Sequence, residues 1–214
     1  MTTLLTMKGF NKQIDYLCFT ANTAGSTVKL NKWAYAPSNN FEISNDGIVF
    51  TDYTAGSTIT LTNIWDKVYF RNKSETPSNI RTGNPNWYWY YFSMTWSIAA
   101  SGDCNFMLCK NSTDTLFNYC FSWLFAWCAA LTSAPKLPAT TLKQYCYYNM
   151  FANCSNIKLS ATQTWEYQNE YRIPTTWTWT TATDALTNMF NWTWWTFKWT
   201  PTINTTYYTS NTVV

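Results

Sequence analysis

The sequence predicts an α+β protein, with a small antiparallel β-sandwich over residues 1–95 and a short α/β solenoid with a C-terminal cap over residues 96–214. Two observations predict this class. Short segments of alternating apolar residues, separated by turn residues, fill the first region. In the second region a pattern of seven residues recurs at a fixed offset, which is typical of stacked structural repeats.

Strands are expected wherever apolar residues alternate between turn signals. The expected segments contain the pairs Leu17 and Phe19, Val28 and Leu30, and Phe41 and Ile43, followed by Ile48–Tyr53, Thr58–Leu61, Lys67–Phe70 and Trp87–Met94. Asn45-Asp46-Gly47 stands between two of these segments, and this tripeptide favours a hairpin turn. Turns at roughly 8–12 residue spacing are typical of a small antiparallel sandwich.

The repeat has an offset of 26 residues. Leu116, Tyr119, Cys120, Phe121, Phe125, Cys128 and Leu131 recur as Leu142, Tyr145, Cys146, Tyr147, Phe151, Cys154 and Ile157. Each copy predicts a short helix, at Leu116–Phe125 and at Leu142–Phe151, and a Pro-bounded strand follows the first between Ala134 and Thr141. A third, worn copy is expected around Asn188-Met189-Phe190, and residues 184–214 are expected to form the cap.

These repeats resemble those of a known family. The run TLKQYCYYNMFANC, preceded by LTSAPKLPATT, resembles the BspA-like leucine-rich repeats of bacterial surface proteins and of proteins in gut-associated phages. The segment FEISNDGIVFTDYTAGSTITLTNIWDKVYFRN resembles the Ig-like β domain that precedes such repeats. The resemblance implies a leucine-rich-repeat fold and a role as an adhesion or interaction scaffold, and it leaves the partner open.

Composition excludes several classes of function. Only 12% of residues are charged and the net charge is +3 without any basic run, which argues against a nucleic-acid partner. No apolar segment approaches the roughly 18 residues of a membrane span, and the N-terminus lacks the pattern of a signal peptide. Histidine is absent, which removes the Ser-His-Asp and Cys-His nucleophile systems and all histidine-containing metal sites.

The remaining catalytic and metal candidates are weak. Glu166 and Glu170 are the nearest approach to a glycosidase-like carboxylate pair, but a solvated connecting segment is the favoured interpretation. The seven cysteines include two pairs at the repeat offset, Cys120 with Cys146 and Cys128 with Cys154. Stacked small buried side chains are favoured over a disulfide or metal ladder. The sequence therefore predicts no catalytic residue, no metal and no cofactor.

Aromatic residues supply the binding candidates. Tyr88, Trp89 and Tyr90 belong to an aromatic strand in which one face is core and the other is either a sugar-stacking platform or a packing surface for the first repeat. Lys136, Tyr148, Lys158 and Tyr167 are expected on an exposed face of the solenoid, the surface that repeat proteins use for contacts.

The function favoured by these features is non-enzymatic. We expect a surface or virion-attached interaction protein, of the phage decoration or fibre type, which holds a partner protein or glycan on a cell or particle surface through its repeats. A carbohydrate-binding module that uses exposed aromatics is the alternative. Localisation at a virion or an extracellular cell surface is expected, and a homo-oligomer is left open.

The distribution of glycine and tryptophan is unusual. All six glycines lie in the first 102 residues, and the remainder of the chain contains none but carries nine of the 14 tryptophans. In the resembling family, glycine is usual at the positions of Trp65, Trp96, Trp127, Trp192, Trp194 and Trp195. Two interpretations stay open: a codon for glycine has been read as tryptophan, or the protein has a genuine tryptophan-studded surface.

Overall fold

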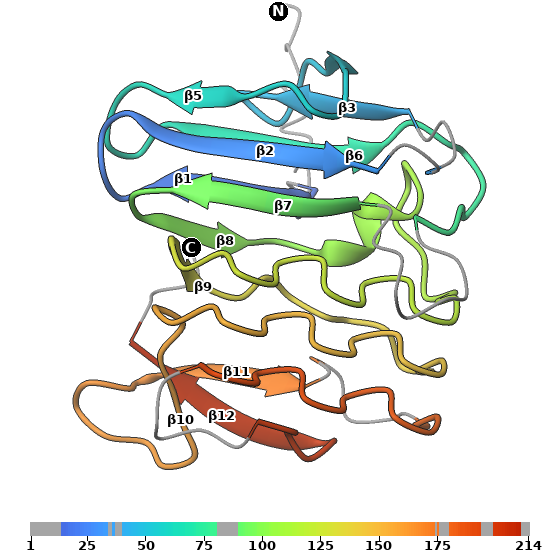
Figure 1. Ribbon diagram of the computed structural model, residues 1–214, viewed down its shortest axis with the longest axis vertical. Coiled ribbons are helices and arrows are strands. Elements are labelled where there is room, and N and C mark those ends of the chain that lie inside the picture. The colour runs from blue at the N-terminus through green and yellow to red at the C-terminus, as the bar shows by residue number, and fades with distance from the viewer. Residues whose placement is uncertain are drawn as a thin grey trace, which may run out of the picture.

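A computed structural model describes residues 14–33, 36, 40–80, 90–173, 175, 180–193 and 199–210 of the chain. In this part the chain forms β-strands and turns. Figure 1 shows strands at one end of the molecule, irregular stacked turns in the middle and a small sheet at the other end. The single helical segment of the described chain is a 3-10 turn, η1 (Cys104–Met107).

Two sheets make the sandwich. The larger has the order β4-β3-β6-β1-β8-β9 and the smaller has the order β5-β2-β7. The bounds of these strands are β1 Leu17–Ala21, β2 Ser26–Lys32, β3 Phe41–Ser44, β4 Thr51–Tyr53, β5 Ile59–Leu61, β6 Lys67–Asn72, β7 Tyr90–Thr95, β8 Ile98–Ser101 and β9 Leu131–Ser133. Pairing is antiparallel except between β8 and β9, which run parallel.

Alternation of buried and exposed residues explains the sandwich. In β2 the side chains of Ser26, Val28 and Leu30 are buried and their neighbours are not, as expected of a strand with one face on a core. The two sheets meet through aromatic rings: the Phe92 ring of β7 lies 4.8 Å from Phe19 and 5.3 Å from Phe70, both in the other sheet. Each expected segment thus contains a strand, but only Thr51–Tyr53 of the expected Ile48–Tyr53 is extended, and residues 87–89 of the aromatic segment lie outside the described residues.

The repeats form three stacked rungs, which we define as residues 116–131 (rung 1), 142–157 (rung 2) and 181–193 (rung 3). Every second amide of a rung donates to the rung below, as in Tyr119 N to Gln144 O at 3.0 Å and Phe121 N to Cys146 O at 2.9 Å. The intervening amides donate within the rung to the carbonyl three residues earlier, as Cys120 N does to Phe117 O. This pattern pairs the main chain without forming a helix or a regular strand.

The α+β class is wrong, and so are the helices predicted at Leu116–Phe125 and Leu142–Phe151. The described chain has no α-helix there because every fourth residue of a rung has a positive φ, which interrupts a right-handed helix. These left-handed residues are Tyr119, Trp123 and Trp127 in rung 1, Tyr145, Asn149 and Asn153 in rung 2, and Asp184, Asn188 and Trp192 in rung 3.

A column of phenylalanines joins the sandwich to the rungs. The rings of Phe92, Phe125, Phe151 and Phe190 stack in succession at 5.2, 5.4 and 5.2 Å, with interplanar angles of 8°, 2° and 10°. The buried apolar residues of both regions belong to one cluster. The degenerate third copy around Asn188-Met189-Phe190 therefore forms a rung of its own. The division of the chain into two domains near residue 95 stays a prediction.

A small sheet follows the second rung. It has the order β10-β12-β11, with β10 at Leu159–Ser160, β11 at Asn169–Ile173 and β12 at Thr205–Thr209. Figure 1 places β11 and β12 at the end of the molecule opposite to β3 and β5. The region predicted to be the cap thus supplies rung 3 and the strand β12 of this sheet.

Candidate binding face

Two aspartates of the sandwich make structural contacts. Asp46 accepts hydrogen bonds from the amides of Ile48 and Val49, and Asp52 forms an ion pair with Lys73 at 2.6 Å. No group of three or more potential metal ligands is present among the described residues. Glu166 is exposed in a loop and Glu170 is exposed on β11.

Two open hollows lie on the sandwich. One, of about 450 Å³, is lined by Ile14, Asp15, Tyr16, Cys18, Lys67, Tyr69, Ser101 and Lys136. The other, of about 490 Å³, is lined by Lys32, Asn40, Phe41, Asp52, Tyr53, Thr54, Ala55 and Lys73. Each hollow contains a lysine that forms an ion pair with an aspartate. Lys136 pairs with Asp15 at 2.6 Å in the first hollow, and Lys73 pairs with Asp52 at 2.6 Å in the second. Neither hollow brings an acid and a base together in a catalytic arrangement.

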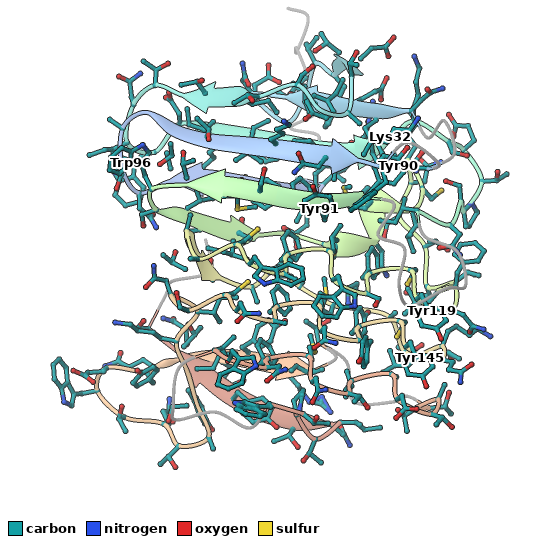
Figure 2. All side chains as sticks on the ribbon, viewed as in Figure 1. Lys32, Tyr90, Tyr91, Trp96, Tyr119 and Tyr145 are labelled. Carbon is teal, nitrogen blue, oxygen red and sulfur yellow. The ribbon has the colours of Figure 1, made fainter. Side chains whose placement is uncertain are left out.

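The left-handed turns build a more distinctive feature at one end of the rungs. Tyr119 and Tyr145 occupy the same position in successive rungs, and their rings stack at 4.7 Å with an interplanar angle of 14°. Figure 2 shows the two side chains one beneath the other. Asp184 has the corresponding position in rung 3 and hydrogen-bonds the Tyr145 hydroxyl. We call Tyr119, Tyr145, Tyr148 and Asp184 the tyrosine face.

Electrostatics ties the members of the tyrosine face together. The hydrogen bond and the negative charge of Asp184 raise the pKa of Tyr145, because a carboxylate stabilises the neutral phenol and opposes the phenolate. Thr187 Oγ1 donates to Asp184 Oδ1 at 3.1 Å and holds the carboxylate in place. The Tyr148 ring meets Tyr145 edge-on at 5.5 Å. All four side chains are partly exposed, so the face is ordered yet accessible.

The residues predicted as binding candidates lie in different surroundings. Tyr88 and Trp89 fall outside the described residues. Tyr90 is only 3% exposed, and its ring packs on Phe41 in the core of the sandwich. The core side of the aromatic strand is therefore the side of Tyr90 and Phe92.

The four predicted residues of the solenoid do not form a cluster through their described contacts. Lys136 is paired with Asp15 beside the sandwich, Lys158 is exposed after rung 2, and the Tyr167 amide bonds Thr164 in a tight turn. Tyr148 alone belongs to the tyrosine face. These positions stay predictions, and the structure offers Tyr119, Tyr145 and Asp184 beside Tyr148.

Two members of the tyrosine face could have been recognised in the sequence. Tyr119 and Tyr145 are a matched pair at the 26-residue offset, but a helix in this segment does not place them on a stacked outer edge. Asp184 had no such signal, because rung 3 follows an insertion and its residue lies 39 positions after Tyr145.

None of the seven cysteines forms a disulfide, and all seven are buried. The Cys128 thiol donates to Phe92 O at 3.2 Å and the Cys154 thiol donates to Phe125 O at 2.9 Å, so each thiol reaches the preceding layer of the stack. Burial raises the pKa of Cys128 to about 12 and raises that of Cys154 well above its usual value. The thiols of Cys128 and Cys154 are thus uncharged packing groups, and they are poor nucleophiles at neutral pH.

Comparison with known proteins yields no match among family models, curated proteins or solved structures. The resemblance to BspA-like repeats therefore stays a prediction. In the described part of the chain, no helix is long and apolar enough to cross a membrane.

Proposed function

We propose that this chain is a non-enzymatic interaction module, displayed on a virion or cell surface, that binds a partner protein through the tyrosine face of its rungs. The observation that carries the proposal is the stacked pair Tyr119 and Tyr145 with Asp184 bound to its end. Tyrosine offers large, rigid contact area and a hydroxyl at low cost in side-chain entropy, and it is enriched where proteins bind one another.

The rungs supply a rigid support for this face. Tyr119 N donates to Gln144 O of the next rung, and Tyr147 N and Asn149 N of rung 2 donate to Ala185 O and Thr187 O of rung 3. The phenylalanine column adds a buried stack that runs through the same three rungs, with ring separations of 5.4 and 5.2 Å. A surface that is ordered before binding loses less entropy on association, which favours affinity.

The orientation of the rings favours a protein partner over a sugar. A sugar ring binds an aromatic side chain by lying on an open ring face, which carries the negative end of the quadrupole. Tyr119 and Tyr145 cover one face of each other at 4.7 Å, and Tyr148 places a third ring against Tyr145. The hydroxyls and the Asp184 carboxylate suit hydrogen bonds to a polypeptide.

Binding by matched variants tests this proposal. The full chain, the double variant Tyr119→Ala/Tyr145→Ala and the control Tyr91→Ala are presented to surface-protein preparations from virions or cells and to a printed glycan array. Tyr91 is a partly exposed tyrosine on β7 of the sandwich, and Figure 2 shows it apart from Tyr119 and Tyr145. We expect protein binding that the double variant loses at least tenfold and the control retains.

Two results contradict the proposal. Equal binding by the double variant and the parent chain removes the tyrosine face from the contact. Binding confined to the glycan array supports the carbohydrate-binding alternative. Circular dichroism and thermal denaturation of each variant show whether a lost signal reflects lost folding.

A further inference from the structure

The tryptophans of this chain adopt an unusual main-chain conformation. Eight of the 14 lie among the described residues, and five of these eight have a positive φ: 74° at Trp65, 65° at Trp96, 63° at Trp123 and Trp127, and 57° at Trp192. Only a few per cent of non-glycine residues adopt positive φ, and bulky side chains are rarer there than Asn and Asp. A concentration of this kind in one residue type requires a cause.

The same conformation is used by glycine elsewhere in the chain. The four described glycines, Gly25, Gly47, Gly56 and Gly102, all have φ between 73° and 98°. Glycine reaches this region at no steric cost, whereas a Cβ is placed against the following carbonyl oxygen and disfavours the conformation about tenfold. The tryptophans thus stand in sites of glycine geometry.

The turn at Trp65 shows this in detail. Asp66 N donates to Asn63 O at 3.2 Å, which closes a β-turn with Trp65 as its third residue. A positive φ at the third residue defines a type II or I′ turn, where glycine is the preferred residue. The Trp65 amide bonds Ala21 O at 2.8 Å, so the main chain is fixed at this point irrespective of the side chain.

The side chains gain little packing in return. Trp65 and Trp96 are each 72% exposed, Trp127 is 58% exposed and Trp192 is 62% exposed. Figure 2 shows Trp96 at the edge of the molecule opposite to Tyr119 and Tyr145. Trp123 is partly buried, and its ring lies 5.0 Å from Trp127, another member of the set, and 6.0 Å from Tyr148. Exposed indoles in strained main chain are a poor use of the residue that buries the largest apolar area.

We infer that Trp65, Trp96, Trp123, Trp127 and Trp192 stand at positions that the natural source of this chain reads as glycine. A reassigned stop codon, which different genetic codes read as either residue, supplies the mechanism. The absence of glycine after Gly102 in a turn-rich region has the same origin. The tyrosine face retains all four of its side chains under this inference, whereas the exposed indoles of Trp65, Trp96, Trp127 and Trp192 disappear.

Peptide mass mapping of the chain isolated from its natural source tests the inference directly. Tryptic peptides over residues 33–67, 82–110, 111–136 and 173–198 together cover all five positions. We expect masses that report glycine, and a reassigned stop codon in the gene at each of the five positions. Tryptophan masses at these positions, or the ordinary tryptophan codon there, overturn the inference.

Stability provides a second test that needs only recombinant protein. Replacing Trp65 or Trp96 by glycine removes left-handed strain, so the unfolding equilibrium constant is expected to fall about threefold after the entropy cost of glycine is subtracted. Trp165→Gly is the control, because Trp165 is 82% exposed without positive φ. We expect the control to be neutral or less stable. Equal destabilisation by all three changes contradicts the inference.

Discussion

The sandwich and the rungs share one core and pair their main chains differently. In the sandwich, extended strands pair along their length, so Leu17 to Thr20 of β1 face Lys67 to Phe70 of β6 residue by residue. In the rungs, alternate amides point to the next rung and the others close local turns. A buried core can therefore be built without regular secondary structure, as long as its main-chain amides find hydrogen-bond partners.

The two regions also differ in what fixes a turn. The hairpin between β3 and β4 relies on two local side chains and on Gly47, which has φ of 73°. Asp46 accepts from the amides of Ile48 and Val49, and the Ser44 hydroxyl accepts from the Gly47 amide at 2.9 Å. The turns of the rungs have no glycine in this sequence, and their left-handed residues are held by the ladder to the adjacent rung, as Trp127 N is by Ala152 O at 2.8 Å. Rung turns therefore depend on stacking, whereas the hairpin is locally determined.

The largest expected effect is at the junction of the two regions. Gly102 has φ of 73°, and an added Cβ would lie 1.8 Å from the Tyr16 carbonyl oxygen. Gly102 O also accepts from Lys136 N at 2.7 Å. Gly102→Ala is expected to lose about 3–5 kcal/mol from overpacking and strain, or to prevent folding. Urea denaturation measures the loss.

Gly25 is the control for this change. It has φ of 76° with nothing within 4 Å of an added Cβ, so Gly25→Ala carries the conformational strain alone, about 1 kcal/mol. Similar urea midpoints for Gly102→Ala and Gly25→Ala would show that the close approach to the Tyr16 carbonyl adds no further destabilisation.

The second effect tests whether the phenylalanine column couples the regions. Phe151 is fully buried between Phe125 and Phe190, so Phe151→Ala is expected to cost about 3–5 kcal/mol through the cavity that it leaves. If the shared core makes one cooperative unit, thermal denaturation followed by circular dichroism and by fluorescence shifts to one lower midpoint. Loss of the rungs alone, with the sandwich unchanged, would contradict this coupling.

Tyr147→Phe is the matched control in the same rung. The Tyr147 hydroxyl is buried and has no hydrogen-bond partner among the described residues, and burial raises its pKa well above the usual value. The change keeps the ring and removes a buried polar group, so stability is expected to stay equal or to rise by about 1 kcal/mol.

The smallest effect separates the locally capped hairpin from the rungs. Hydrogen bonds from the Ile48 and Val49 amides lower the pKa of Asp46 to about 2, below the unfolded value of about 3.9. The folded pKa is depressed, so the stabilising contribution is present above pH 4 and is lost as the pH falls toward 2. The Asp46→Ala variant is thus expected to be less stable than the parent chain at pH 7 and to match it more closely near pH 2.

Carboxyl carbon chemical shifts measured by NMR across this pH range give the pKa itself. An Asp46 that titrates near 4 would show that the capping hydrogen bonds do not form in solution.

Much of the architecture could be read from the sequence. The alternation of Val28 and Leu30 with polar neighbours predicted β2, and the recurrence of Phe125 at Phe151 predicted units that stack. Both signals survive because they depend on which residues are buried, and burial is written into the spacing of apolar residues. The recurrence of Asn149-Met150-Phe151 as Asn188-Met189-Phe190 predicted a third unit, and this unit is rung 3.

The helices could not be excluded from the sequence alone. Buried pairs such as Cys120-Phe121 and Leu124-Phe125 recur every four residues, and this spacing departs from helical periodicity by only about 40° per repeat. Over so short a segment the two patterns overlap. The choice is made by Tyr119, Trp123 and Trp127, whose positive φ allows every second amide to reach rung 2.

Local apolar patterning in the sequence is enough to predict strands β1 to β7, the period of the repeat and the burial of its cysteines. Strands β8 and β9 of the larger sheet, the path of the rungs and the meeting of Tyr119, Tyr145 and Asp184 depend on tertiary contacts. Hydrogen bonds between rungs come from residues 25 or more positions apart, and an insertion changes that separation before rung 3. A contact of this kind exists only once the rungs have stacked.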